Sequence, residues 1–306
     1  MTVLKTRIPW TDTTVNPTWG CTKISAGCDN CYAEAINTHR ARVPFEEIRT
    51  FPKRLDEIRR LKPLLKDGRI VPRMVFLNST SDIFHERIDP AFRGKVFDAM
   101  EANPTTIFQL LTKRPGVAQR FLRARYGALG KAPAHLWLGV SIENNDVKKR
   151  IDVLRDITRR HGVSCAFLSV EPLIGPIDTC DFTGMNWVLI GGESGARCRP
   201  MHTDWLRSAI AKAQQADAAI WFKQFGHPRN NPVIAKIMAD ERVTQTAAIS
   251  LAAARGLELA ADEKGGATLD GKLYRELPRA WHDLNAALVL DGDATKPSAV
   301  AAQNKM

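Results

Sequence analysis

The amino-acid sequence predicts an α/β protein, a full or partial TIM-type barrel of six to eight parallel βα units. Two observations predict this class. Short apolar runs rich in β-branched and aromatic residues recur along the chain, and stretches with apolar residues at helical spacing separate them. Strands that alternate with helices form a parallel sheet with right-handed crossovers. A doubly wound open sheet is the alternative, because a sequence does not reveal whether a sheet closes.

The expected strands are almost continuously apolar, the pattern of parallel strands that are covered on both faces. One strand is expected before Gly20, and the six runs that follow it are residues 74–77, 106–111, 136–140, 165–170, 187–190 and 219–222. This count gives six or seven βα units by residue 225, which favours a barrel. In either fold, functional side chains are expected at the carboxyl ends of the strands.

The expected helices fall between these runs. Asp89 and Pro90 indicate the N-cap and first residue of one helix, and Thr203 is expected to cap a later one. After residue 226 the alternation of strands and helices fades, and the Ala-rich composition of residues 234–261 predicts helix. We therefore expect three parts, which are a barrel domain over residues 1–230, a helical or irregular extension over 231–290 and a disordered tail over 291–306.

The composition is that of a globular chain: of 306 residues, 44% are apolar and 25% are charged. No apolar run reaches the roughly 18 residues that span a bilayer, and the first residues lack the apolar stretch of a signal peptide. We therefore expect a cytoplasmic protein without a membrane partner. In that compartment the six cysteines are expected to be free, metal-bound or catalytic rather than disulfide-bonded.

The chain is basic, with 44 Lys and Arg against 33 Asp and Glu, a formal charge of +11. The bases cluster over residues 40–73, and a second group lies over residues 148–160. Clustered bases can neutralise phosphates and release counterions, although a solvated helix face has the same composition. We take Arg54, Arg59 and Arg60 as candidate nucleic-acid contacts.

Three cysteines within eleven residues give the sharpest signal in the sequence. Cys21, Cys28 and Cys31 have the spacing C-x6-C-x2-C, and a helix is expected over residues 31–42 directly behind them. Thiolates at a helix N-terminus are stabilised by its dipole and free N–H groups. Three thiolates on a four-iron cluster leave one iron open for a ligand, which is the interpretation we favour. A zinc site with a fourth ligand such as His39, or free buried cysteines, are the alternatives.

Several segments of this chain resemble a known family. The segments are residues 8–34, 75–86, 108–115, 137–144, 167–177, 187–195 and 221–226. On them the chain resembles the radical S-adenosylmethionine enzymes and, more specifically, the phage and prophage "three-Cys-motif" proteins. The resemblance implies a 4Fe-4S cluster on Cys21, Cys28 and Cys31, S-adenosylmethionine as second cofactor, an electron-donor protein and a partner protein encoded nearby. The first cysteine gap is longer here than the usual C-x3-C.

Polar residues follow the expected strands and are costly there unless they are satisfied or used. The candidate cofactor-binding residues are Tyr32, Asn78, Ser79, Lys113, Arg114, Ser141, Glu143, Asn144, Glu171, Gly191, Gly192 and Glu193. Lys113 or Arg114 would pair the carboxylate of adenosylmethionine. Ser79, Glu143 or Asn144 would bind its ribose, and the two glycines would let the backbone approach a ligand closely.

Three classes of function are compatible with these features. The leading hypothesis is a radical enzyme that modifies or repairs a base in a nucleic acid or nucleotide, with no catalytic residue assigned. A second is a barrel hydrolase or lyase that uses Glu143, Glu171 and Glu193 as acid–base groups, which leaves the cysteines unexplained. A third is a non-catalytic, metal-containing nucleic-acid-binding protein, which leaves the polar strand ends unexplained.

Overall fold

The main sheet of the protein is parallel and has seven strands. The computed structural model describes residues 6–40, 43–257 and 264–294. The strands are β1 (Thr13–Val15), β6 (Arg73–Leu77), β7 (Thr106–Thr112), β8 (Leu136–Ser141), β9 (Ala166–Val170), β10 (Trp187–Gly191) and β11 (Ala219–Gln224). They lie in the sheet in that same order, and every neighbouring pair is parallel.

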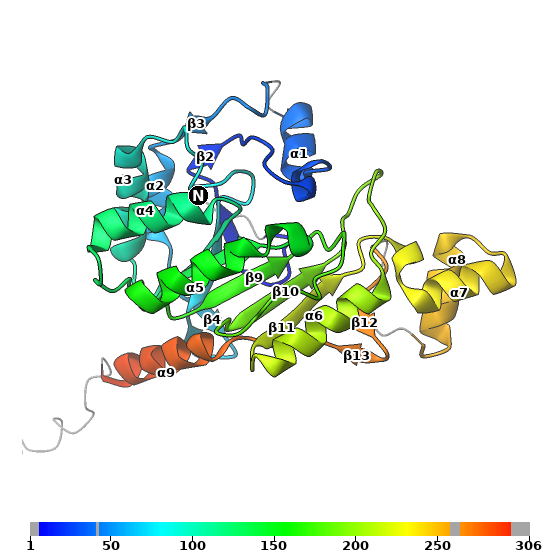
Figure 1. Ribbon diagram of the computed structural model, residues 1–306. Coiled ribbons are helices and arrows are strands. Elements are labelled where there is room, and N and C mark those ends of the chain that lie inside the picture. The colour runs from blue at the N-terminus through cyan, green and yellow to red at the C-terminus, as the bar shows by residue number, and fades with distance from the viewer. Residues whose placement is uncertain (1–5, 41–42, 258–263, 295–306) are drawn as a thin grey trace, which may run out of the picture.

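The sheet curls into a half-barrel with β1 and β11 as its edges (Figure 1). A doubly wound sheet reverses its strand order at a switch point. The order here never reverses, so the predicted partial TIM-type barrel is confirmed and the doubly wound alternative is wrong. Each of the six apolar runs forms one of the strands, and all of them except the edge strand β11, whose residues alternate between buried and half-buried, are largely buried on both faces.

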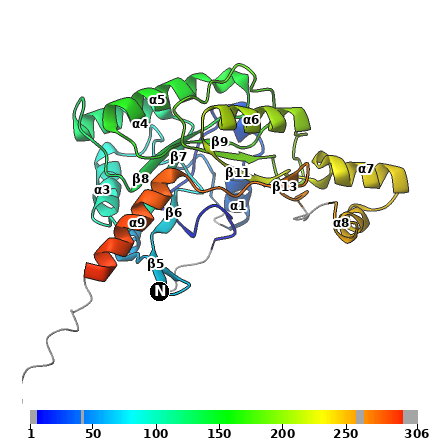
Figure 2. The ribbon, with the colours of Figure 1, turned by 90° about the horizontal axis from the view of Figure 1, so that it is seen from below.

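Helices cover the outer face of the half-barrel. They are α2 (Arg54–Arg60), α3 (Pro90–Glu101), α4 (Pro115–Tyr126), α5 (Lys149–His161) and α6 (Thr203–Gln215). In Figure 2, α4, α5 and α6 lie along one side of the sheet and α9 (Arg279–Ala294) lies along the other. Asp89 caps α3 as predicted, since its side chain accepts a hydrogen bond from the Ala91 N–H. The predicted cap of α6 is wrong by one residue, because His202 occupies the N-cap and Thr203 begins the helix.

The inner face of the half-barrel is filled with aromatic side chains at one end. The Trp187 ring lies 6.1 Å from those of Trp10 and Trp137 and 6.3 Å from that of Trp221. Ala280 of α9 is part of the same core cluster, and Trp281 packs against it. This apolar cluster fills one end of the interior, and polar side chains lie at the carboxyl ends of the strands.

The extension expected over residues 231–290 contains two helical parts. One is the pair α7 (Pro232–Glu241) and α8 (Gln245–Ala254), which has a small core of its own and projects beside the barrel in Figure 1. The other is α9, which follows the hairpin of β12 (Thr268–Leu269) and β13 (Lys272–Leu273). Helix α9 runs to Ala294, past the boundary expected at residue 290, and the rest of the predicted tail lies outside the described residues.

The segment between β1 and β6 carries Cys21, Cys28 and Cys31. It contains β2 (Thr18–Trp19), which pairs with β3 (Arg49–Thr50), and a hairpin of β4 (Leu64–Lys66) and β5 (Arg69–Val71). The short helix η1 (Ala26–Cys28) and α1 (Tyr32–Arg40) follow β2, so a helix begins directly after Cys31 as predicted. Residues 41–42 of that predicted helix lie outside the described residues. All six cysteines are free thiols.

Two further short helices, η2 (Asn145–Val147) and η3 (Pro228–Asn230), follow the ends of β8 and β11. Within the described ranges, no helix has both the length and the apolar character needed to cross a bilayer.

Candidate functional site

A loop of residues 21–31, which we call the cysteine loop, joins β2 to α1 at the carboxyl end of the sheet. Gly20 enters the loop with a φ of +84°, a backbone conformation that favours glycine. A Cβ at this position would lie 2.7 Å from the carbonyl oxygen of Phe45, which itself accepts a hydrogen bond from the Cys21 N–H at 2.9 Å. The tight approach of Gly20 to this segment fixes where the loop begins.

The three cysteines of the loop line one cavity of about 140 Å³, which we call the cysteine cavity. Other lining residues include Tyr32, Asn78, Ser79, Lys113, Arg114 and Ser141. The structure therefore brings together the cysteines and six of the predicted cofactor-binding residues, from α1 and from the ends of β6, β7 and β8.

The cysteines surround the cavity and do not meet at a point. In the described part of the chain, no three His, Cys, Asp or Glu side chains form a group that would hold a single ion. An iron–sulfur cluster is held by separate cysteines on separate irons, so three thiols around one cavity are a suitable donor set for it. The side chain of His39, the fourth ligand of the zinc alternative, lies outside the described residues. Burial raises the pKa of the Cys21 thiol to about 11, although the Arg114 guanidinium opposes that rise.

Arg114, at the end of β7, holds the start of the cysteine loop. Its Nε donates to Glu86 at 2.8 Å, and its Nη1 donates to the Cys21 sulfur and to Asp82, both at 3.4 Å. Its Nη2 donates to the carbonyl and hydroxyl oxygens of Thr22, both at 2.9 Å. A guanidinium has five N–H groups, and protein atoms accept from all five. Arg114 therefore supports the loop and has no donor left for the carboxylate of a cofactor.

Glu143, beyond the end of β8, holds the middle of the loop. Its carboxylate is 1% exposed, and it accepts hydrogen bonds from the Ser25 hydroxyl at 2.9 Å and from Arg150 at 3.0 Å. Lys113 lies 3.3 Å from the same carboxylate. Gly27 packs directly on the Glu143 carboxylate, so the Glu143 side chain supports the cysteine loop at this point.

Glu193, beyond the end of β10, holds the end of the loop. It accepts a hydrogen bond from the Asn30 amide at 2.9 Å and forms an ion pair with Arg199 at 2.5 Å. Arg199 in turn donates to the carbonyl oxygen of Ala26 at 2.8 Å and pairs with Asp29 at 3.2 Å. Burial alone would raise the pKa of Glu193, but hydrogen bonds from Arg199 and Asn30 hold that pKa below its usual value.

The other predicted cofactor-binding residues are not among the described residues that line the cysteine cavity. Asn144 caps η2, with its side chain accepting from the Asp146 N–H. Glu171 pairs with Lys223 at 2.5 Å, and Gly191 packs against the Glu171 side chain. A Cβ on Gly192 would collide with the carbonyl of Phe225. Both glycines therefore allow close packing between strand ends, rather than contact with this cavity.

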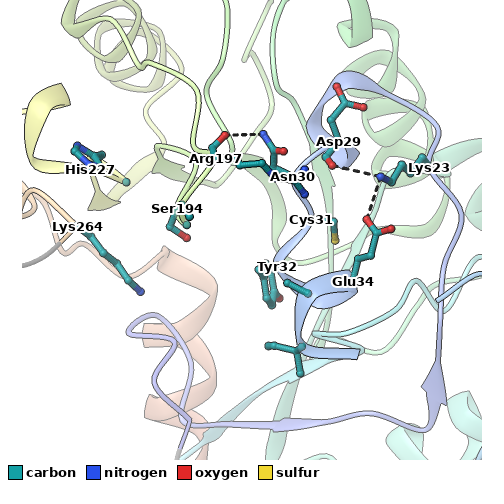
Figure 3. Close-up of a pocket in the computed structure, with 15 residues that line it drawn as sticks. Lys23, Asp29, Asn30, Cys31, Tyr32, Glu34, Ser194, Arg197, His227 and Lys264 are labelled. Atoms are coloured by element: carbon teal, nitrogen blue, oxygen red, sulfur yellow. Dashed lines mark hydrogen bonds and ion pairs between the residues drawn. The ribbon is translucent and has the colours of Figure 1, made fainter. Parts of the chain in front are cut away.

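A second cavity, of about 880 Å³, lies next to the first, and we call it the wide cavity. Cys31 and Tyr32 line both cavities. Figure 3 shows Lys23, Asn30 and Glu34 on the side of the cysteine loop, and Ser194, His227 and Lys264 across from them. The sequence alone does not indicate Asn30, Arg199 or this second wall, because isolated polar residues in loops carry no distinguishing pattern.

The arginines predicted to contact nucleic acid lie on or at the start of α2, away from both cavities. Arg59 pairs with Asp56 at 3.1 Å, and the Arg54 guanidinium lies 5.8 Å from the centre of the Phe51 ring. None of the three, including the exposed Arg60, lines either cavity in the described part of the chain.

The fold and this site define an α/β half-barrel protein with a three-cysteine loop at the carboxyl end of its strands. The chain belongs to the family described as "Protein of unknown function (DUF5131)", which matches residues 5–278. The resemblance to phage proteins stays a prediction.

Two solved structures are similar in fold. Spore photoproduct lyase complexed with dinucleoside spore photoproduct is 13% identical with a TM-score of 0.41, and a mutant of spore photoproduct lyase is 14% identical with a TM-score of 0.42. Each comparison covers 70% of this chain, which spans 64% of the other chain's length. No curated protein matches the sequence.

Proposed function

We propose that this chain is a radical S-adenosylmethionine enzyme that acts on a nucleic acid or nucleotide, with a 4Fe-4S cluster held by Cys21, Cys28 and Cys31. The observation that carries the proposal is that all three thiols line one polar cavity at the carboxyl end of a parallel half-barrel. When bound, the cluster and adenosylmethionine would supply one-electron cleavage of the cofactor's C5′–S bond. This chemistry requires an electron-donor protein as partner.

Asn78 supports a ligand in the cysteine cavity. Its side chain is buried, and its amide nitrogen donates to the hydroxyls of Thr18 and Ser81. Its Oδ1 has no hydrogen-bond partner among the described residues. A buried acceptor without a partner costs about 1–3 kcal/mol, which a ligand N–H group would recover. We therefore assign Asn78 the role of accepting from the amino group of adenosylmethionine.

Lys113 is the cation for the cofactor's carboxylate. The other candidate, Arg114, has given all five N–H groups to protein atoms. The Lys113 ammonium has three donors, and its one ion pair in the described part of the chain is with Glu143. Its side chain is 20% exposed and lines the cavity, so a ligand carboxylate can reach it.

The remaining lining residues exclude water from the cavity. Phe45, Phe76 and Leu111 supply apolar surface between the cysteines and the strand ends. Loss of competing water strengthens every charged contact inside such a site. Ser79 and Ser141 are the hydroxyls left to bind the ribose, since Glu143 is committed to the cysteine loop.

A nucleic-acid or nucleotide substrate is supported by the formal charge of +11. The exposed arginines of α2 would add electrostatic attraction for a polyanion at a distance from the site.

Anaerobic reconstitution tests the proposal. The purified chain, reconstituted with iron and sulfide, should bind about four irons and four sulfides. After reduction it should release 5′-deoxyadenosine and methionine from adenosylmethionine. A chain that binds no cluster, or a reduced cluster-containing chain that forms no 5′-deoxyadenosine, would contradict it.

The hydrolase alternative has less support. Each of its three carboxylates is paired with a base: Glu143 with Arg150, Glu171 with Lys223 and Glu193 with Arg199. Hydrogen bonds from Arg199 and Asn30 hold the pKa of Glu193 below its usual value, so Glu193 is a poor general acid. The non-catalytic alternative leaves the unpartnered acceptor of Asn78 without a role.

A further inference from the structure

The wide cavity adjoins the cysteine cavity, in which we place both cofactors of the proposed reaction, and the two cavities share Cys31 and Tyr32. We propose that the wide cavity is a nucleotide-binding site, in which a base stacks on the Tyr32 ring and the phosphate lies against the wall formed by Arg197 and His227. The inference rests on the proposed function and names the place where its substrate binds.

Tyr32 has the features of a stacking platform. It is 48% exposed, which is high for an aromatic side chain, and it lines the wide cavity. Its hydroxyl donates to the backbone carbonyl of Ser79 at 2.5 Å, so the ring is held between α1 and the end of β6. A fixed, exposed ring loses little conformational entropy when a base stacks on it, and any base offers a suitable face.

Arg197 supplies positive charge where the loop after β10 meets the cysteine loop. Its backbone carbonyl accepts a hydrogen bond from Asn30 at 2.9 Å, which fixes the loop where it faces the cysteine loop (Figure 3). Its side chain is exposed, and among the described residues its guanidinium forms no ion pair. An exposed guanidinium without an ion pair can form two parallel hydrogen bonds to a phosphate.

The acids that line the wide cavity are paired with bases, although not one to one. Glu34 pairs with Lys23 at 3.0 Å, and Asp29 pairs at 3.2 Å with Arg199, which also pairs with Glu193. These ion pairs weaken the repulsion of an anion, and the charge of Arg197 attracts one.

His227 provides a hydrogen-bond donor on the same wall. Its Nδ1 accepts from the Arg229 N–H at 3.1 Å, so in the neutral imidazole the proton is assigned to Nε2. The side chain lines the wide cavity across from Tyr32 (Figure 3). A base on Tyr32 and a phosphate near His227 would thus occupy opposite sides of one cavity.

The volume limits what can enter. Cavities that bind small ligands measure about 300–1,000 Å³, and this one measures about 880 Å³. It accommodates a nucleotide and excludes a base-paired duplex. The ligand is therefore either a free mononucleotide or one nucleotide of a single strand or of a locally opened duplex, which share a base and a phosphate.

The test is equilibrium binding of fluorescein-labelled pentathymidylate to the full chain, followed by anisotropy without adenosylmethionine or reductant. Tyr32→Ala should weaken binding about 5- to 150-fold, the usual loss for one base stack. Tyr32→Phe should retain most of the affinity, because it keeps the ring. Arg197→Ala should lower the slope of log affinity against log salt by about one. Arg123→Ala, at an exposed arginine of α4, is the matched control and should change neither quantity.

Competitors distinguish the sources of the nucleotide. Displacement of the probe by thymidine monophosphate supports a free nucleotide as ligand, and displacement by unlabelled pentathymidylate alone supports a nucleic acid. Equal displacement by inorganic phosphate and thymidine monophosphate would overturn the inference, because the base would then contribute nothing. Unchanged affinity in folded Tyr32→Ala, or equal losses in Arg197→Ala and Arg123→Ala, would overturn it as well.

The outcome is separable from that of the proposed function. Iron content and 5′-deoxyadenosine release are measured on the same preparation without nucleotide. Cofactor cleavage without nucleotide binding contradicts this inference and leaves the proposed radical chemistry standing, whereas nucleotide binding without a cluster contradicts the proposed chemistry and leaves this inference standing.

Discussion

Gly27 of the cysteine loop lies directly on the carboxylate of Glu143. A Cβ at Gly27 would lie 2.5 Å from the Oε1 of Glu143 and 2.7 Å from its carboxyl carbon. The Glu143 side chain is fixed by Arg150 and Ser25, so it has little freedom to move aside. The absence of a side chain at Gly27 therefore sets how closely Cys28 approaches the strand ends.

Gly27→Ala should displace the cysteine loop and reduce the iron bound after anaerobic reconstitution several-fold. Overpacking of this kind costs about 1–3 kcal/mol, which should also lower the melting temperature. Gly94→Ala in α3 is the control, since no atom lies within 4 Å of its added Cβ and alanine favours a helix. Full iron content in Gly27→Ala would mean that the loop tolerates displacement.

Arg199→Ala should loosen the end of the cysteine loop, because Arg199 bonds to the Ala26 carbonyl and to Asp29 while paired with Glu193. In protein without a cluster, Cys28 and Cys31 should then be alkylated several-fold faster by iodoacetamide, as measured by mass spectrometry. The control is Arg207→Ala on α6. It removes an exposed ion pair with Asp270 that has no contact with the cysteine loop, so these alkylation rates should be unchanged. Equal rates in wild type and Arg199→Ala would show that Arg199 does not position the loop.

Much of the fold is predictable from the sequence, because strands buried on both faces are continuously apolar. The runs at residues 74–77 and 187–190, for example, coincide with β6 and β10. The three cysteines and several of the polar strand ends that the sequence indicates line one cavity, Lys113 and Asn78 among them, and their function stays a prediction.

The roles of the strand-end residues were less predictable. Glu193 bonds to Asn30, which is 163 residues away in the chain, and Arg114 bonds to Thr22 across 92 residues. Contacts at such separations leave no local pattern. The sequence therefore predicted that these charged groups face a ligand, whereas the structure has Glu193 and Arg114 holding the cysteine loop.

Cys28→Ala should remove most of the bound iron, because cluster thiolates act as a unit. Cys165→Ala is the matched control. Its thiol is fully buried in the core cluster that contains Trp187, and it does not line the cysteine cavity, so iron content should be unchanged while stability falls modestly. A full iron complement in Cys28→Ala would remove Cys28 from the ligand set.

Acid should destabilise the fold through Asp156 of α5. Hydrogen bonds from Arg160, Arg159 and Gln119 hold the pKa of Asp156 at about 2. A carboxyl group whose pKa is lower in the folded chain stabilises it above about pH 4, and that contribution is lost as the pH falls towards 2. Asp156→Asn should therefore lower the urea midpoint at pH 6 more than at pH 2.5. Asp204→Asn, at a carboxylate with 93% side-chain exposure, should show no such difference.

The last prediction concerns Lys113 and cofactor affinity. Lys113→Ala removes the cation that we assign to the carboxylate of adenosylmethionine, at a side chain that lines the cysteine cavity. Losing a hydrogen bond between charged groups costs about 1.5–3 kcal/mol, so affinity should fall roughly 10- to 150-fold. Iron content should be unchanged, because Glu143 keeps its bonds to Arg150 and Ser25 and continues to support the loop.

Calorimetry on the reconstituted protein checks this expectation, with Lys95→Ala on α3 as an exposed lysine control. Unchanged affinity in Lys113→Ala would contradict the assignment. Because the five N–H groups of Arg114 are already bonded to protein atoms, the carboxylate would then need a partner outside the residues at the end of β7. Loss of iron together with affinity would instead show that Lys113 acts through Glu143 on the cysteine loop, since the two side chains lie 3.3 Å apart.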